Sequence, residues 1–300
     1  MLNVRNKSLI HYHFIVFIFG FSSVLGALCS LDALPLVVYR MLLACLGLAV
    51  FFGLFHSNYF ILSKGLWPKV ILGGLIIGVH WVTFFHAIKV AGVSLTLSMM
   101  ATGAFITAML EPLINKRKIS LYELLFGGFI VFGVGIIFQA EYEHLYGISV
   151  ALISAFLSAV FTILNTQLVS QARPITLSFY ELLIGGIVGV FVVFFSGQYS
   201  LEAFQLEGWD LLWILLIALV CTSYAFNISL RVMQHLSPFT VMVIINLEPV
   251  YGILLSLAVW GEEELLSSRF YLGFVVILAT ILMNGYLKRK KLTNENESQL

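Results

Sequence analysis

Long apolar stretches separated by short polar segments repeat along the whole chain. Each stretch holds about 20 residues, the length of helix needed to cross a bilayer core of roughly 30 Å. The pattern predicts an all-α integral membrane protein with ten transmembrane helices. These are expected at about Leu9–Cys29, Leu34–Phe55, Trp67–Ile88, Gly92–Asn115, Leu121–Gln139, Gly147–Val169, Ile175–Phe195, Trp209–Leu230, Pro238–Trp260 and Phe270–Leu287. A hydrophilic tail, Lys288–Leu300, follows and is expected to be disordered.

The first apolar stretch resembles a signal peptide at first sight, because Arg5 and Lys7 precede it. It is too long for the hydrophobic region of such a peptide, and no cleavage site with small residues follows. Leu28 also stands where a lipoprotein processing site needs a small residue before Cys29. The stretch is therefore interpreted as the first membrane helix, after a short N-terminal segment, residues 1–8.

Basic residues concentrate in alternate loops. If the N-terminus is cytoplasmic, the inside segments hold most of them: Arg5, Lys7, Lys64, Lys69, Lys116, Arg117, Lys118, Arg173, Arg231, Lys288, Arg289, Lys290 and Lys291. The outside loops collect acids instead: Asp32, Glu141, Glu143, Glu202, Glu207, Asp210, Glu262, Glu263 and Glu264. The positive-inside rule then predicts cytoplasmic termini, an even number of crossings and a location in the cytoplasmic membrane.

The composition agrees with a chain that has lipid as its solvent. Hydrophobic residues make up 60% of its 300 residues and charged residues 10%, against about 25% charged in soluble domains. Ten spans leave no room for a sizeable soluble domain, and a net charge of +1 gives no reason to expect a nucleic-acid partner. The three cysteines lie in apolar segments without disulfide or metal spacing, so no metal or cofactor is expected.

The two halves of the chain resemble each other in sequence at a nearly constant shift. Residues 87–95 align with residues 233–241, and at the same shift Gly103 aligns with Pro249 and Gly127 with Gly273. Further upstream, Tyr39-Arg40 resembles Tyr180-Glu181. Because five helices is an odd number, a second five-helix repeat, 147–287, must be inverted relative to the first, 9–139. Such inverted repeats are typical of secondary transporters.

Several motifs in these repeats are similar to a known family. They are residues 85–94 (FHAIKVAGVS), 231–240 (RVMQHLSPFT), 246–252 (NLEPVYG) with Glu262 beyond them, and 110–118 (LEPLINKRK). On these residues the chain resembles the drug/metabolite transporter superfamily, of the two-repeat EamA type, over nearly its whole length. One departure is Gly103, where the family often has a proline, so the two halves are expected to hinge differently.

The resemblance implies a central substrate cavity between the halves, lined mainly by the third, fourth, sixth, eighth and ninth helices. It also implies small organic substrates such as amino acids, metabolites or drugs, often exported. Monomer and homodimer both remain open.

Ionisable side chains within the membrane are costly, by about 2.5–3.5 kcal/mol at the centre on insertion scales, so each needs a reason. Glu248 lies near the middle of the ninth helix beside Pro249, which frees a carbonyl near Ile245. This polar notch is suited to a proton, a cation or a substrate amine. The alternative is a protonated carboxyl that only ties helices together.

Three further charged residues are candidates for coupling or gating. Glu111, beside Pro112, lies near the cytoplasmic end of its helix, where a salt bridge to the basic residues 116–118 is the competing interpretation. Arg40 and Glu181 are counterparts in the repeat at opposite depths, too far apart to pair directly. Each is interpreted either as a gate for its own vestibule or as a helix anchor.

Polar and aromatic residues in the spans complete the candidate substrate site. His80 and Trp81 lie at mid-depth on the third helix and are suited to stacking a planar or cationic substrate, or to core packing. Thr102, Asn165, Asn227 and Asn246 are candidates for cavity lining. Buried amides also serve as contacts between helices, worth roughly 0.6–2 kcal/mol each. The many glycines are expected mainly to allow close helix packing.

Secondary transport is the function that these features favour. No phosphate-binding loop of the G-x-x-x-x-G-K-[ST] form occurs, so the chain alone is not expected to use ATP. An intramembrane protease is a weaker alternative, because Glu263, Glu264 and Arg269 only partly match the pattern of that class and H-E-x-x-H is absent. A passive channel and a receptor without transport activity remain as further alternatives.

Overall fold

The computed structural model describes residues 4–55, 60–116, 118, 121–197, 200–261 and 265–297. Within these ranges the chain is helical, with no strand. The helices are α1 (Val4–Leu28), α2 (Ala33–Phe55), η2 (Lys64–Leu66), α3 (Trp67–Ala91), α4 (Val93–Met100), α5 (Gly103–Ile114), α6 (Leu121–Ala140), η3 (Tyr142–His144), α7 (Leu145–Leu168), α8 (Pro174–Ser196), η4 (Leu201–Phe204), α9 (Asp210–Leu215), η5 (Leu216–Tyr224), α10 (Ala225–Met233), α11 (Pro238–Ile245), α12 (Glu248–Trp260) and α13 (Ser268–Glu297).

Eight helical segments of the described chain are long and apolar enough to cross a membrane. Four of them join consecutive elements: η2 with α3, α4 with α5, α9 with η5 and α10, and α11 with α12. Two shorter apolar helices lie within α6 and α13. The prediction of an all-helical membrane protein is therefore confirmed, whereas the total of ten crossings stays a prediction.

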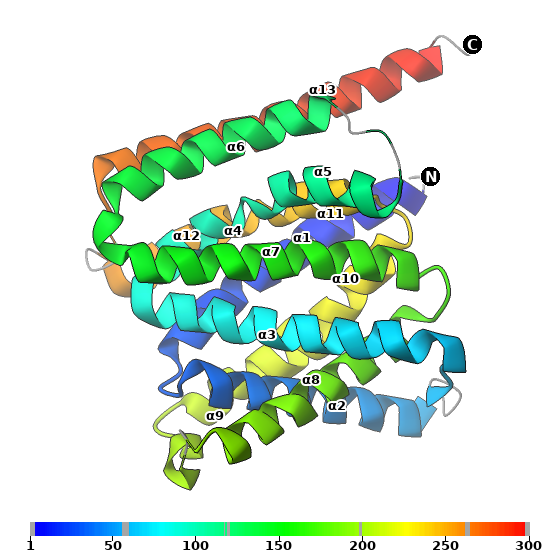
Figure 1. The fold of residues 1–300 in the computed structure, drawn as a ribbon, viewed down its shortest axis with the longest axis vertical. Helices are drawn as coiled ribbons and strands as arrows, with labels where there is room; N and C mark the ends of the chain where they lie inside the picture. The colour runs from blue at the N-terminus through cyan, green and yellow to red at the C-terminus, as the bar shows by residue number, and fades with distance from the viewer. Residues whose placement is uncertain are drawn as a thin grey trace.

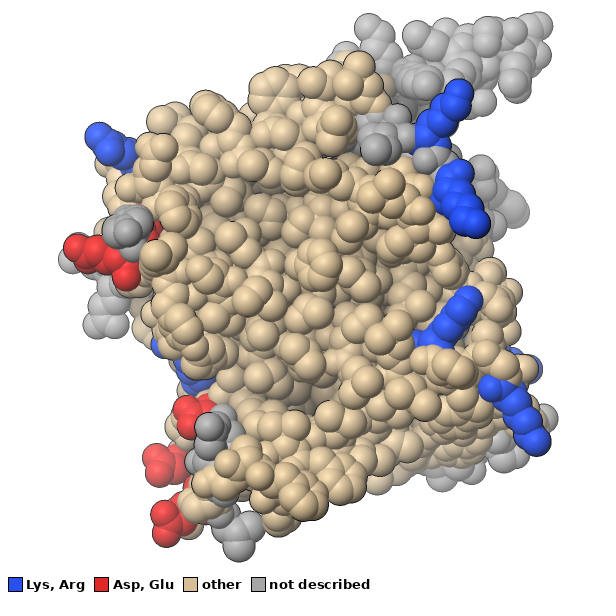
Figure 2. Space-filling model, in the orientation of Figure 1, with Lys and Arg blue, Asp and Glu red and all other residues tan. Residues whose placement is uncertain are grey.

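The helices run side by side between two edges of the molecule, and both chain termini lie at the same edge (Figure 1). Figure 2 shows Lys and Arg side chains along that edge, acidic side chains at the opposite edge and a broad uncharged band between them. Many large apolar side chains are exposed, among them Phe129, Phe194 and Leu254, as expected of a surface that faces lipid.

Paired glycines bring helices into close contact. On α6 and α13, a methyl group added to Gly133 would lie 2.8 Å from the carbonyl oxygen of Gly273, and one added to Gly273 would lie 2.6 Å from that of Gly133. These two helices form a layer of their own at one side of the molecule (Figure 1). The expected packing role does not extend to Gly128 and Gly135, which have open space around them.

Two spans are broken at matching positions of the two halves. Ala101 and Thr102 separate α4 from α5, and Asn246 and Leu247 separate α11 from α12. The two breaks are joined directly, because the Asn246 side chain donates a hydrogen bond of 3.1 Å to the carbonyl oxygen of Ala101. The break between α4 and α5 therefore forms beside Gly103 without a proline, whereas Pro249 follows the break between α11 and α12.

The last helix differs from the expectation at its end. It was predicted to stop near Leu287, but α13 continues to Glu297, so its charged end is helical where a disordered tail was expected. Residues with long unbranched side chains, such as Lys, Arg and Glu, have high helix propensity. The helix can therefore continue beyond its apolar part.

Candidate functional site

A cavity of about 80 Å³ lies at the centre of the bundle. It is lined by α1 (Phe19, Ser22), α2 (Arg40), α3 (Ile77, His80, Trp81, Phe84), α4 (Met100), α7 (Ser158, Phe161, Thr162), α10 (Phe226, Ser229, Met233), α11 (Ile245) and α12 (Glu248). The space brings together four residues singled out in the sequence: Arg40, His80, Trp81 and Glu248. Helices from both halves of the chain therefore build one mainly apolar pocket that contains a few charged and polar groups.

Arg40 is held by an aromatic ring on one side and a hydroxyl on the other. Its guanidinium carbon lies 3.7 Å from the centre of the Trp81 ring, and its Nε donates a hydrogen bond of 2.8 Å to Thr222 Oγ1. A desolvated cation–π contact of this kind is worth about 2 kcal/mol. Because only Nε is used by Thr222, the other guanidinium nitrogens are the donors that the cavity offers to a ligand.

A π-helical stretch places the hydroxyl of Thr222. In η5 the chain makes wide turns, and Thr222 Oγ1 donates to the carbonyl of Ile217, five residues earlier, at 2.7 Å. Ser223 repeats the pattern with Ala218 at 3.1 Å. Wide turns of this kind are frequent at functional sites, and here one presents the acceptor for Arg40.

Glu248 is the first residue of α12, directly after the break in its span. A helix N-terminus favours negative charge, which offsets part of the cost of a carboxylate at this depth. Among the described residues no group donates a hydrogen bond to this carboxylate. Arg40 and Glu248 lie close enough for their charges to interact across the cavity. The cavity thus offers one cation and one anion.

His80 is fixed by the facing helix α7. Its Nδ1 lies 2.8 Å from Ser154 Oγ and 3.0 Å from the Ser154 carbonyl oxygen, while the ring lies beside Phe84. The nitrogen that faces Ser154 is therefore occupied, and Nε2 is the one left for other contacts.

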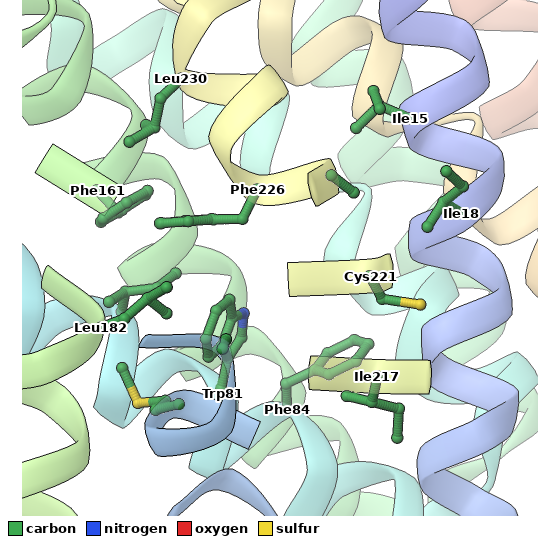
Figure 3. Close-up of a cluster of buried hydrophobic side chains, with 14 of the residues drawn as sticks. Ile15, Ile18, Trp81, Phe84, Phe161, Leu182, Ile217, Cys221, Phe226 and Leu230 are labelled. Atoms are coloured by element: carbon green, nitrogen blue, oxygen red, sulfur yellow. The ribbon is translucent and has the colours of Figure 1, made fainter. Parts of the chain in front are cut away.

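Aromatic rings form the apolar wall of the cavity. The Phe226 ring centre lies 5.5 Å from that of Trp81, edge to face, and 5.7 Å from that of Phe161, stacked. Figure 3 shows Trp81, Phe161 and Phe226 gathered around one space, with Phe84 nearby. Phe161 and Phe226 were not predicted from the sequence, because a phenylalanine in an apolar helix carries no signal that distinguishes a cavity-lining side chain from a lipid-facing one.

The other predicted site residues lie elsewhere. Thr102 donates to the carbonyl of Met99 at 2.8 Å, and Asn246 binds Ala101, so both serve the helix breaks. Asn227 is buried on α10, and Asn165 binds Glu181 on α8 at 2.9 Å. Glu111 accepts a hydrogen bond of 2.8 Å from Asn115. None of these six residues lines the central cavity.

Comparison with known proteins gives the family. The EamA-like transporter family matches the chain twice, over residues 9–139 and 145–286. The chain belongs to the EamA-like transporter family. A crystal structure described only as that of a protein has a similar fold, with a TM-score of 0.69 at 12% identity, covering 95% of this chain and 98% of that one. Among proteins of curated function the sequence has no significant match.

The family match confirms the resemblance and makes this EamA-family chain a multi-pass membrane transporter. EamA-family proteins are transporters rather than enzymes. Glu263 and Glu264, which raised the protease alternative, and Glu262, part of the family motif, lie outside the described residues. Within the described ranges, no group of three or more His, Cys, Asp or Glu side chains is placed to hold a metal ion.

The central cavity of this EamA-family protein adjoins a wider cleft at one edge. That cleft, of about 530 Å³, is lined by Thr166, Val169, Ser170, Met233, Gln234, His235 and Leu236, at the ends of α7 and α10. Met233 lines both spaces. The ends of α7 and α10 lie at the edge that carries the chain termini (Figure 1). The cleft and the central cavity therefore lie on either side of Met233.

Hydrogen bonds gather around Asp210, at the start of α9, towards the opposite edge. Its carboxylate accepts from the backbone N–H of Ser30 at 2.8 Å, from Ser30 Oγ at 2.5 Å and from the backbone N–H of Glu207 at 2.9 Å. Lys89, near the end of α3, donates to the carbonyl of Cys29 beside it. These contacts join the turn between α1 and α2 to the beginning of α9.

Proposed function

We propose that the chain is a secondary transporter for small zwitterionic organic solutes, of the amino-acid class. The observation that carries this proposal is that Arg40 and Glu248 line the same small cavity, together with aromatic rings. A solute with a carboxylate and an ammonium group satisfies both charges at once. Without it, two opposite charges stay only partly compensated in a poorly hydrated space.

Recognition would divide among three parts of the cavity. The free guanidinium nitrogens of Arg40 bind the carboxylate, and Glu248 binds the ammonium group. The rings of Trp81, Phe161 and Phe226 contact the apolar part of the solute. Ligand cavities usually measure about 300–1,000 Å³, so the 80 Å³ cavity must widen to admit a solute.

Movement between two inverted five-helix repeats would supply that widening. The two broken spans meet at the Asn246–Ala101 hydrogen bond, where each half has a natural point of bending. We further propose that the basic edge is cytoplasmic, that both termini lie in the cytoplasm, and that the protein resides in the cytoplasmic membrane. Closure around Asp210 and the cleft at the termini edge would then describe an inward-facing state, in line with export driven by a proton gradient.

The test is a flux assay in proteoliposomes with radiolabelled amino acids, their decarboxylated amines and their deaminated acids. Zwitterions should exchange, and the single-charge analogues should compete poorly. Glu248→Gln should lower the exchange rate at low substrate about 10- to 100-fold, as expected when a charged hydrogen bond worth about 1.5–3 kcal/mol is lost. Arg40→Gln should weaken competition by deaminated acids most.

Glu111→Gln is the matched control, because Glu111 also precedes a proline in a membrane span but lies outside the cavity. It should exchange zwitterions at the rate of the unmodified protein. Equal exchange by Glu248→Gln and the unmodified protein would contradict the proposal. Flux that does not saturate with any solute would favour a channel instead.

A further inference from the structure

Glu181 is a second buried acid that the central cavity does not use. It lies on α8, has no exposed surface and does not line the cavity. Helices α2, α3 and α10 pack against α8, and α7 brings Asn165 to its carboxyl group. A carboxyl group shielded from water on every side must be stabilised by its neighbours or lose its charge.

The hydrogen bonds around this carboxyl group are incomplete. Glu181 Oε1 accepts from Asn165 Nδ2 at 2.9 Å, but Glu181 Oε2 and Asn165 Oδ1 are buried without any partner. Both unpaired atoms are acceptors. The pair therefore lacks a partner, which a proton on the carboxyl group, a bound cation or a water molecule would supply.

The packing around Glu181 favours a proton, which is smaller than a metal cation. A methyl group added to Gly73 of α3 would collide with Glu181 Oε1, and one added to Gly74 would lie 2.8 Å from the Glu181 backbone oxygen. A metal cation needs about six oxygen ligands, whereas a proton needs none beyond the pair itself. The space against α3 thus fits a proton.

No charged side chain in the described part of the chain neutralises Glu181. The titratable groups on the surrounding elements are Tyr39, Arg40 and Cys45 on α2, Lys69, His80, His86 and Lys89 on α3, Tyr146 on α7, Tyr180 on α8 and Arg231 on α10. None of them makes a hydrogen bond or ion pair with the carboxyl group of Glu181. Asn165 is its hydrogen-bonding partner.

We propose that Glu181 and Asn165 form a proton-binding site, separate from the substrate cavity, through which the transporter takes up and releases its coupling proton. In the closed arrangement the carboxyl group is neutral: Oε1 keeps the hydrogen bond from Asn165 Nδ2, and Oε2, the oxygen otherwise without a partner, carries the proton. When α3, α7 and α8 separate, water solvates the carboxylate and the proton leaves.

A route for that proton lies close by. Thr166, next to Asn165 in the chain, lines the cleft of about 530 Å³ at the edge that carries the termini. A movement at the end of α7 would connect the cleft to the pair. A proton bound there holds α8 against α3 and α7, which links protonation to the closure of this half of the bundle.

The inference rests on the proposed function, and its test separates proton coupling from solute binding. In proteoliposomes, Glu181→Gln should keep zwitterion exchange in the absence of a gradient within about twofold of the unmodified protein. It should lose accumulation driven by a pH gradient, and substrate should no longer move protons, as reported by a pH-sensitive dye inside the vesicles. Glu111→Gln, the matched control, should keep all three activities.

Infrared spectroscopy of the purified protein tests the site without transport. The unmodified protein and Glu111→Gln should show the absorption of a buried protonated carboxyl group, and Glu181→Gln should lack that component. Its presence in Glu181→Gln, or gradient-driven accumulation by that variant, would overturn the inference. So would loss of exchange in a variant that unfolds at the normal temperature, or accumulation that follows a sodium gradient instead. Absence of exchange in the unmodified protein would refute the proposed function while the infrared result still decides the proton site.

Discussion

Two residues that occupy matching places in the repeat have opposite chemistry and different surroundings. Arg40 faces the central cavity, where Trp81 and Thr222 hold its guanidinium group. Glu181 is buried between α3, α7 and α8, with Asn165 as its partner. In the proposals made above, Arg40 provides a permanent positive charge for a solute, and Glu181 provides a carboxyl group that gains and loses a proton. The sequence pointed to both residues but could not separate these roles.

At the residue scale, we expect Thr222→Val to weaken solute binding through Arg40. The change keeps the shape of the side chain and removes the acceptor of a neutral–charged hydrogen bond, worth about 1.5 kcal/mol, so KM should rise roughly tenfold. The maximal exchange rate should change little, because Arg40 stays in contact with Trp81. Concentration-dependent counterflow measures both quantities.

Thr280→Val is the control for this substitution. Thr280 is also a buried threonine, and its hydroxyl donates within α13 to the carbonyl of Val276 at 2.7 Å, far from the cavity in the chain. An equal rise in KM for both variants would show that Thr222 does not act by positioning Arg40.

Among the elements, the irregular parts of the helices carry the site. The break before α12 makes Glu248 the first residue of a helix, and η5 turns Thr222 towards Arg40. The sequence predicted a freed carbonyl near Ile245, because Pro249 removes a backbone donor, but it did not predict that the span divides there into two helices. It did not predict η5, since no residue in Leu216–Tyr224 marks a π-helix. That element depends on hydrogen bonds such as the one between Ser223 and Ala44 of α2.

The contacts of Asp210 give a prediction about the closed edge. Asp210→Asn should weaken its bonds to Ser30, because one carboxylate oxygen becomes a donor, and so favour opening at that edge. Cys29 beside it is a natural reporter. It has 1% exposed surface, and burial raises the pKa of its thiol to about 11, so a membrane-impermeant maleimide should react slowly.

In a Cys45→Ala, Cys221→Ala background, Asp210→Asn should speed labelling of Cys29 at least severalfold. Glu207→Gln in the same background is the control, since Asp210 contacts only the backbone N–H of Glu207. Equal labelling of the two variants would mean that Asp210 does not hold this edge closed.

Over the whole molecule, the positions of the chain termini and of the charged side chains bear on the orientation of the protein in the membrane. Both termini and many basic side chains lie at one edge, and acids lie at the other (Figures 1 and 2). The positive-inside rule assigns the basic edge to the cytoplasm. This gives a direct expectation for the accessibility of exposed residues at each edge.

In a variant without Cys29, Cys45 and Cys221, Glu143→Cys should react with an impermeant maleimide on intact cells. Lys69→Cys should react only after the cells are permeabilised. Both side chains are exposed, so the comparison reports sidedness rather than burial. The opposite pattern would reverse the proposed orientation, and the cleft would then open to the outside of the cell.

The sequence by itself determined the class of protein and its all-helical architecture, and it pointed to Glu248, Arg40, His80 and Trp81 as candidates. These follow from local physics: lipid demands apolar helices, and each polar group within them needs a reason. Only the tertiary structure decided which of those groups share a space. Rotation of each helix about its axis sends Asn165 to Glu181 and Asn246 to Ala101, and leaves Arg40 and Glu248 facing one cavity. That rotation depends on close packing of helices such as α3 and α8 at Gly73 and Gly74, which hydropathy does not encode.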